Sequence, residues 1–199
     1  MIRVIVFDIG GVLINSERSF DGIYEEFANA IGAPPEKIVA MHNRYLDRML
    51  YGKISASGFF VLIKKKFGVK GDLKSLWIKL AMRHITLNKD LLEVVDKLRT
   101  QYQVALLSNV SELRSLIDEE FDLYVHFDHL FLSYKLKMQK PTKRIFLYAL
   151  KKMKVQADEV IFVDDKEINL SAARALGIKS IQFNNNTQLI TELTRLGLL

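Results

Sequence analysis

The sequence contains no cysteine among its 199 residues. This absence excludes a disulfide framework and any metal site built from thiolates. No apolar run approaches the ~18 residues that a membrane-spanning helix needs. The N-terminus opens with a strand-like run and lacks the basic segment and longer apolar segment of a signal peptide. We therefore expect a soluble, cytoplasmic protein without a membrane partner.

The chain is basic, and its charge is distributed unevenly along the sequence. The formal net charge is +6, and residues 15–88 carry most of it, with 12 Lys or Arg against 7 Asp or Glu. These charges either lie on solvated helix faces or produce a field that draws small anionic molecules toward a cleft. The basic run at 64–71 is short and no nucleic-acid motif accompanies it, so we expect no nucleic-acid partner.

Five short apolar runs recur along the chain, without the alternation of a half-exposed strand. They span residues 3–8, 103–108, 129–133, 159–165 and 179–183. Such runs are typical of strands buried on both faces of a parallel sheet. Helical patterns at 111–121, 143–153 and 168–177 separate the later runs. The alternation predicts a doubly wound α/β core with a parallel sheet.

Residues 15–88 interrupt this alternation of strands and helices, because they contain no strand-like run. The pattern of apolar residues in this region predicts about four amphipathic helices, near 19–31, 36–50, 56–67 and 72–86. An insertion of this length is long for a crossover connection. We therefore expect an α/β core domain of residues 1–14 and 89–199 and a helical domain of residues 15–88.

Polar residues stand where the predicted strands end. Asp8 ends the first strand, Ser108 and Asn109 end the second, and Asp164 and Asp165 end the fourth. Lys140 follows the third strand by a few residues. Because ligands of doubly wound sheets bind outside the carboxyl ends of the strands, these residues are candidates for one site.

The chemistry of this set favours phosphoryl transfer with Mg²⁺. Carboxylate ligands without His or Cys suit Mg²⁺, which commonly binds few carboxylates together with substrate phosphate. Asp8 could act as metal ligand and nucleophile, Ser108 could hold phosphate oxygens, and Lys140 could neutralise charge. Taken singly, each residue has a structural explanation, such as a turn, a helix cap or a solvated surface lysine. Their order along the chain favours one shared site.

Four segments carry a resemblance to a known family. They are FDIGGVL (7–13), LLSN (106–109), KMQKPTKRIF (137–146) and FVDDKEIN (162–169). In this order they resemble the motifs of the haloacid dehalogenase-like superfamily, and the helical insertion is similar to its C1-type cap. YGKIS (51–55) and the acidic pair are most similar to the subgroup of α-D-glucose-1-phosphate phosphatase and the phosphatase domain of soluble epoxide hydrolase.

The resemblance implies roles for individual residues. Asp8 corresponds to the nucleophile, Lys140 to the motif-three lysine, and Asp164 with Asp165 to the acidic pair of the magnesium site. The carbonyl of Gly10 would reach the metal, and the N–H of Gly11 would approach the phosphate. Ser108 and Asn109 would bind substrate. Lys137 stands where glycine is common in the family.

Gly10 also stands where most phosphatases of this superfamily carry a second Asp as general acid and base. Three interpretations follow. The first is a magnesium-dependent hydrolase of small phosphomonoesters, with a sugar phosphate favoured by resemblance. The second is dehalogenation or C–P cleavage, the latter with Lys53 as a Schiff-base lysine. The third is a binding or regulatory protein with weak catalysis.

The helical insertion offers candidates for substrate selection. Arg44 and Arg48 share a helical face, and Tyr51 and Lys53 follow near a helix end. They either contact a second part of the substrate or form a solvated surface. The four histidines show no metal-ligand spacing, which indicates structural or surface roles. We expect a monomer or a homodimer.

Overall fold

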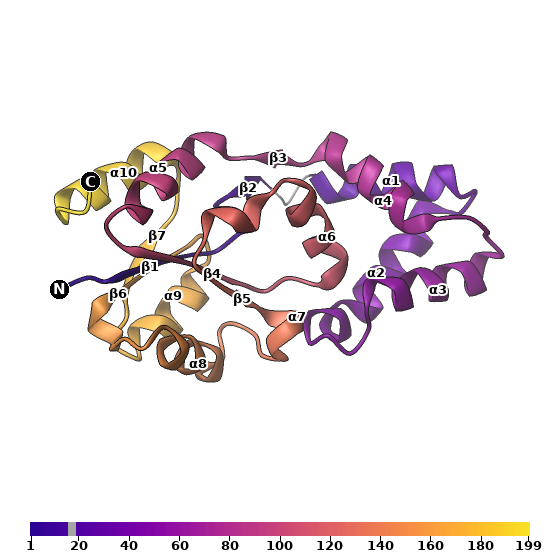
Figure 1. The fold of residues 1–199 in the computed structure, drawn as a ribbon. Coiled ribbons are helices and arrows are strands. Elements are labelled where there is room, and N and C mark those ends of the chain that lie inside the picture. Colours follow the sequence, from indigo (N-terminus) through magenta and orange to yellow (C-terminus); the bar gives the residue numbers. More distant parts are fainter. Residues whose placement is uncertain (16–18) are drawn as a thin grey trace.

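A computed structural model of the protein describes residues 1–15 and 19–199, and the side chains of residues 15–21 lie outside its description. Its main sheet has five parallel strands in the order β5-β4-β1-β6-β7 (Figure 1). These strands are β1 (Val4–Phe7), β4 (Gln103–Ser108), β5 (His129–Leu132), β6 (Val160–Asp164) and β7 (Lys179–Gln182). The predicted parallel sheet is confirmed.

The side chains of β1 show why this sheet needs helices on both faces. Ile5 and Phe7 belong to one buried cluster, and Val4 and Val6 belong to another. Successive side chains of a strand point to opposite faces, so both faces of the central strand are buried. The first cluster joins the sheet to α5 (Lys89–Arg99) and α10 (Asn186–Arg195). The second joins it to α8 (Lys143–Met153) and α9 (Glu167–Arg174).

Shorter elements complete the core. They are α6 (Glu112–Glu120), the 3₁₀ helix η1 (Leu123–His126), α7 (Ser133–Leu136) and the 3₁₀ helix η2 (Ala157–Glu159). Ser111 caps the N-terminus of α6, because its side chain accepts a hydrogen bond from Arg114 N. The helix predicted at 168–177 ends earlier, at Arg174, and the chain turns through Gly177 at φ +86°. Asn185 caps the N-terminus of α10, which begins at Asn186.

The inserted region contains the four expected helices at one end of the molecule (Figure 1). They are α1 (Ser19–Ala30), α2 (Pro35–Leu50), α3 (Ala56–Phe67) and α4 (Leu73–His84). The expectation of no strand here was wrong in one detail. Thr86–Leu87 forms β3, which pairs antiparallel with β2 (Ile14–Asn15). This pair draws the chain entry and the chain exit of the insertion together.

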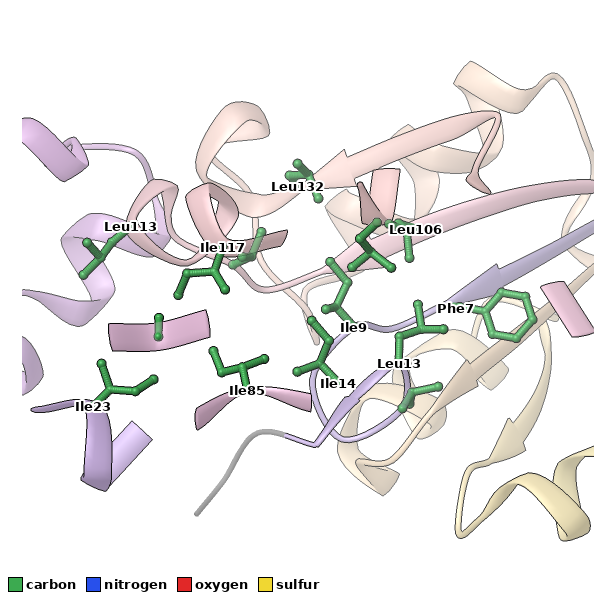
Figure 2. Packing of buried hydrophobic residues seen from close by; sticks show 14 of the residues in the cluster. Phe7, Ile9, Leu13, Ile14, Ile23, Ile85, Leu106, Leu113, Ile117 and Leu132 are labelled. Atoms are coloured by element: carbon green, nitrogen blue, oxygen red, sulfur yellow. The ribbon is translucent and has the colours of Figure 1, made fainter. Parts of the chain in front are cut away.

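The insertion shares its apolar interior with the core. One buried cluster contains Phe27, Phe59 and Trp77 of the inserted helices together with Phe7 and Leu106 of the sheet. Figure 2 shows Ile23 and Ile85 facing Leu113 and Ile117 of α6. The assignment of residues 15–88 to a separate domain stays a prediction. No helix in the described residues is long and apolar enough to span a membrane.

Candidate active site

The register of the sheet brings Asp8 and Asp164 to the same edge. Phe7 pairs with Val163 of β6, so the residues that follow them, Asp8 and Asp164, stand side by side at the carboxyl ends of the two strands. The Asp8 N–H donates to the Val163 carbonyl at 2.9 Å. Asp8 and Asp164 are both buried, at 7% and 0% exposure. Two buried carboxylates side by side require nearby positive charge.

Lys140 supplies that charge from between the two carboxylates. Its Nζ lies 2.8 Å from Asp8 Oδ1 and 2.6 Å from Asp164 Oδ2. The contact with Asp8 is an ion pair, and the contact with Asp164 is both an ion pair and a hydrogen bond. Lys140 is only 3% exposed and is therefore not a surface lysine. The structure brings together the predicted nucleophile, lysine and acid.

Asn109 holds the backbone of Lys140. Its Oδ1 accepts from Lys140 N at 2.8 Å, and its Nδ2 donates to the Lys140 carbonyl at 2.8 Å. The sequence suggested that Asn109 contacts substrate, but both ends of its side-chain amide are engaged by Lys140. Ser108, directly before it at the end of β4, is buried at the same edge of the sheet. Asn109 therefore connects the strand that carries Ser108 to the loop that carries Lys140.

A third carboxylate joins this group. Asp8, Asp164 and Asp165 each offer an oxygen, and these oxygens lie within 4.8 Å of one another. Asn169 orients Asp164, since its Nδ2 lies 3.0 Å from both carboxylate oxygens, and Lys166 N donates to Oδ1 at 2.8 Å. Sequence reasoning missed Asn169, although the segment 162–169 ends on it. The first turn of α9 places it against Asp164.

The electrostatics of the three carboxylates fit a divalent cation. Burial raises the pKa of Asp165, and the Asp8 charge raises it further. Burial also raises the pKa of Asp164, while Lys140 opposes that shift. Lys140 pairs with Asp8 and Asp164, and the Lys166 charge only partly offsets the rise in the pKa of Asp165. Within the described residues the buried Asp165 Oδ1 has no hydrogen-bond partner. An oxygen-only donor set of this charge suits Mg²⁺.

The loop after β1 leaves room for this arrangement. Gly11 has φ +77°, and a Cβ on it would lie 2.5 Å from Asp165 Oδ2. A side chain at this position would therefore displace the carboxylate. The loop folds back on itself through a bridge between Gly10 and Ile14 and a hydrogen bond from Gly11 N to the Ile14 carbonyl at 2.9 Å. Contacts of the Gly10 carbonyl and the Gly11 N–H with ligands stay predictions.

Two of the other substrate candidates, Arg44 and Arg48, lie on the surface of α2. Arg44 and Arg48 flank the ring of Tyr45, at 5.7 and 5.9 Å from its centroid. Arg44 lines a hollow with Lys65 and Lys66 of α3. The buried side chains of α2 are those of Ile38, Met41 and Met49, whereas Arg44 and Arg48 are exposed, and their substrate contacts stay predictions.

Tyr51 and Lys53 lie on the loop after α2, and Lys53 Nζ stands 5.6 Å from the Tyr51 ring centroid. A Cβ on Gly52 between them would lie 2.2 Å from the Tyr134 carbonyl of α7. This loop therefore packs against the segment that leads to Lys140. Substrate contacts of Tyr51 and Lys53 stay predictions that this placement allows.

The histidines have structural contacts within the protein. His84 and His126 pair with Glu26 and Asp96, and His129 lies 3.3 Å from the Gln103 side chain. The remaining one, His42, packs against aromatic rings of the inserted helices. The expected structural and surface roles are confirmed.

Comparison with known proteins identifies the family. Residues 2–177 match the family model of the haloacid dehalogenase-like hydrolases. The D-ribitol-5-phosphate phosphatase of Bacteroides thetaiotaomicron is 30% identical, over 98% of both chains. The phosphorylated carbohydrates phosphatase of Thermotoga maritima is 23% identical, over 90% of this chain and 83% of that protein.

A solved structure resembles the fold and shows which ions a relative binds. It is a HAD family enzyme from Bacteroides thetaiotaomicron, a mutant in complex with magnesium and inorganic phosphate. Its TM-score is 0.79 at 26% identity, with coverage of 95% of this chain and 99% of that chain. The phosphatases among these relatives confirm the expectation of a phosphatase. The match of the family model shows that the chain belongs to the haloacid dehalogenase-like hydrolase family.

Proposed function

We propose that the protein is a magnesium-dependent hydrolase of small phosphomonoesters that reacts through an aspartyl-phosphate on Asp8. The observation that carries this proposal is the position of Lys140 Nζ, 2.8 Å from Asp8 and 2.6 Å from Asp164 in a buried site. The same lysine charge can balance the charge of an incoming phosphoryl group.

The acidic cluster defines where Mg²⁺ would bind. Asp8, Asp164 and Asp165, with the carbonyl of Gly10, would hold it, and the bound ion would neutralise charge on the phosphate oxygens. Asn169 and Lys166 N fix the Asp164 carboxylate, so this ligand is oriented before the ion arrives.

The proposed reaction has two steps. An Asp8 carboxylate oxygen forms a bond to phosphorus while the bond from phosphorus to the substrate alcohol oxygen breaks, and that oxygen takes up a proton. Water then attacks phosphorus, which releases phosphate and restores Asp8. Ser108 would hold the remaining phosphate oxygens. Gly10 offers no acidic side chain, so the proton comes from solvent, from the substrate or from an inserted-helix residue.

The comparisons support the phosphomonoester class. The two named relatives act on D-ribitol 5-phosphate and on phosphorylated carbohydrates. These compounds are therefore the first members of the substrate panel for this chain.

The test is a phosphate-release assay of that panel with Mg²⁺, with EDTA, and with Asp8→Asn. We expect EDTA and Asp8→Asn each to lower kcat/KM by roughly 10³-fold or more, because the metal and the nucleophile are both required. Asp158→Asn is the matched control, since Asp158 is exposed on η2 and should retain full activity.

Two outcomes would contradict the proposal. Metal-independent halide release from a 2-haloacid would assign the chain to dehalogenase chemistry. A folded protein that turns over no phosphomonoester or phosphonate would assign it to binding or regulation. Circular dichroism of each variant shows whether a loss of activity reflects unfolding.

A further inference from the structure

A cavity of about 360 Å³ lies between the inserted helices and the start of α6. Ligand sites in proteins are commonly of this size or larger. Most of its wall is apolar and comes from α2, α4 and the segment after β4. The apolar side chains are Val39, Leu46, Leu50, Trp77, Val110 and Leu113.

The cavity shares a wall with the proposed active site. Asn109 lines it, and the same residue holds both backbone groups of Lys140 at 2.8 Å. Asn109 and Val110 directly follow Ser108. A phosphate bound near Ser108 would therefore have its alcohol part next to this wall.

Several polar groups in the described lining are engaged within the protein, whereas the buried Nε1 of Trp77 has no hydrogen-bond partner and could serve one hydroxyl but not several. The Asn109 amide binds the Lys140 backbone, and Ser111 Oγ accepts from Arg114 N at 3.3 Å. Arg114 Nε donates to the buried Asp118 Oδ1 at 3.0 Å. A sugar or polyol would need a partner for each buried hydroxyl, because an unpaired hydroxyl costs about 1–3 kcal/mol.

His42 adds an aromatic surface to the same wall. Its ring centroid lies 4.9 Å from that of Tyr24, with the two rings tilted by 44°, and 6.2 Å from that of Phe59 in an edge-on contact. Its Nδ1 lies 3.4 Å from Asn43 Oδ1. Burial lowers the pKa of His42, so the imidazole is neutral at pH 7 and adds no charge to the cavity.

We infer that this cavity receives the alcohol part of the substrate and that this part is an apolar alkyl or aryl group. The inference rests on the proposed function, since it assigns the leaving group of the same reaction. A cavity of about 150 Å³ is enough to hold a benzene molecule. The cavity here is more than twice as large, so a chain of roughly eight carbons fits it.

The experiment compares n-octyl phosphate with D-ribitol 5-phosphate. Both are esters of primary alcohols, so the difference in kcat/KM reports the contacts of the alcohol part. We expect octyl phosphate to be preferred by at least about 10-fold, the effect of a few methylene contacts. Leu46→Gln should lower kcat/KM for octyl phosphate about 10-fold and leave that for ribitol phosphate unchanged.

Leu62→Gln is the matched control. Leu62 is also a half-buried leucine of the inserted helices, but it lines the separate hollow beside Arg44. This variant should leave both substrates unaffected. Preference for ribitol phosphate, or an equal effect of Leu46→Gln on both substrates, would overturn the inference while the proposed function stands.

Loss of turnover with both substrates would contradict the proposed function. The inference of an apolar subsite is then tested separately, by the affinity of the protein for the two phosphates. Calorimetric titration of Asp8→Asn in Mg²⁺ measures the affinity for each phosphate without hydrolysis. Tighter binding of octyl phosphate, weakened by Leu46→Gln and with a negative heat-capacity change, supports the apolar subsite. Equal binding of the two phosphates contradicts it.

Discussion

Lys137 adopts a left-handed backbone conformation, with φ +54°, at the residue that ends α7. Residues with a Cβ are strained in this conformation, and glycine is not. The resemblance to the family indicated glycine here, so the structure supplies a physical reason for that preference. The strained backbone lies three residues before Lys140, and the Lys137 side chain is exposed.

Lys137→Gly should therefore stabilise the protein by about 0.5–1 kcal/mol, the cost of a left-handed residue less the entropy that glycine adds to the unfolded chain. Urea unfolding of the two proteins measures this difference. The control is Lys151→Gly, since Lys151 is an exposed residue inside α8. That change should destabilise by about 1 kcal/mol. A loss of stability from Lys137→Gly would contradict the explanation.

The loop after α2 is held against the core at both of its ends. Gly52 lies against the Tyr134 carbonyl, and Ala56 N donates to Glu112 Oε2 of α6 at 3.1 Å. Tyr51 and Lys53 flank the first of these contacts. The geometry of this loop therefore depends on α6 and α7 as well as on α2.

For this loop we predict that Gly52→Ala lowers the free energy of unfolding by more than Gly68→Ala does. Both glycines follow helices and have similar φ values, +63° and +68°, but nothing lies within 4 Å of a Cβ at Gly68. The shared backbone strain costs about 1–2 kcal/mol, and the collision with Tyr134 adds about 1–3 kcal/mol at Gly52 alone. Thermal unfolding measures both variants, and equal losses would show that the loop is not packed against α7.

The molecule as a whole has an interior that crosses from the sheet into the inserted helices. Leu113 and Ile117 of α6 are buried in this cluster beside Ile23 and Ile85 of the insertion, and Ile9 and Ile14 continue it toward the sheet (Figure 2). A shared apolar interior couples the parts of a protein, because neither part can unfold without exposing the surface of the other.

We therefore predict one cooperative unfolding transition, with calorimetric and van't Hoff enthalpies that agree. Leu113→Ala should lower the free energy of unfolding by about 2–5 kcal/mol and keep the transition single. Leu147→Ala is the control, since Leu147 is 53% exposed on α8 and should change stability by less than about 0.5 kcal/mol. Two separate transitions would show that the inserted helices unfold independently.

The strands were predictable because their pattern is local. The apolar runs at β1, β4 and β6 lack alternation, which identifies strands buried on both faces whatever their partners. The polar residues at their ends then had to meet, since parallel strands share one carboxyl edge. By contrast, β2 and β3 have two residues each and exist only because distant segments pair.

The sequence by itself determined the α/β class, the inserted helices and the order of Asp8, Ser108, Lys140 and the acidic pair along the chain. Helical periodicity also put Arg44 and Arg48 on one face, but the packing of α2 decided that another face meets the core. Only the tertiary structure assigned Asn109 to the Lys140 backbone and Asn169 to Asp164. The physical reason is the distance along the chain over which each property is decided. The periodicity of a segment reflects the burial of that segment alone, whereas the partner of a side chain depends on how elements far apart in the sequence pack together.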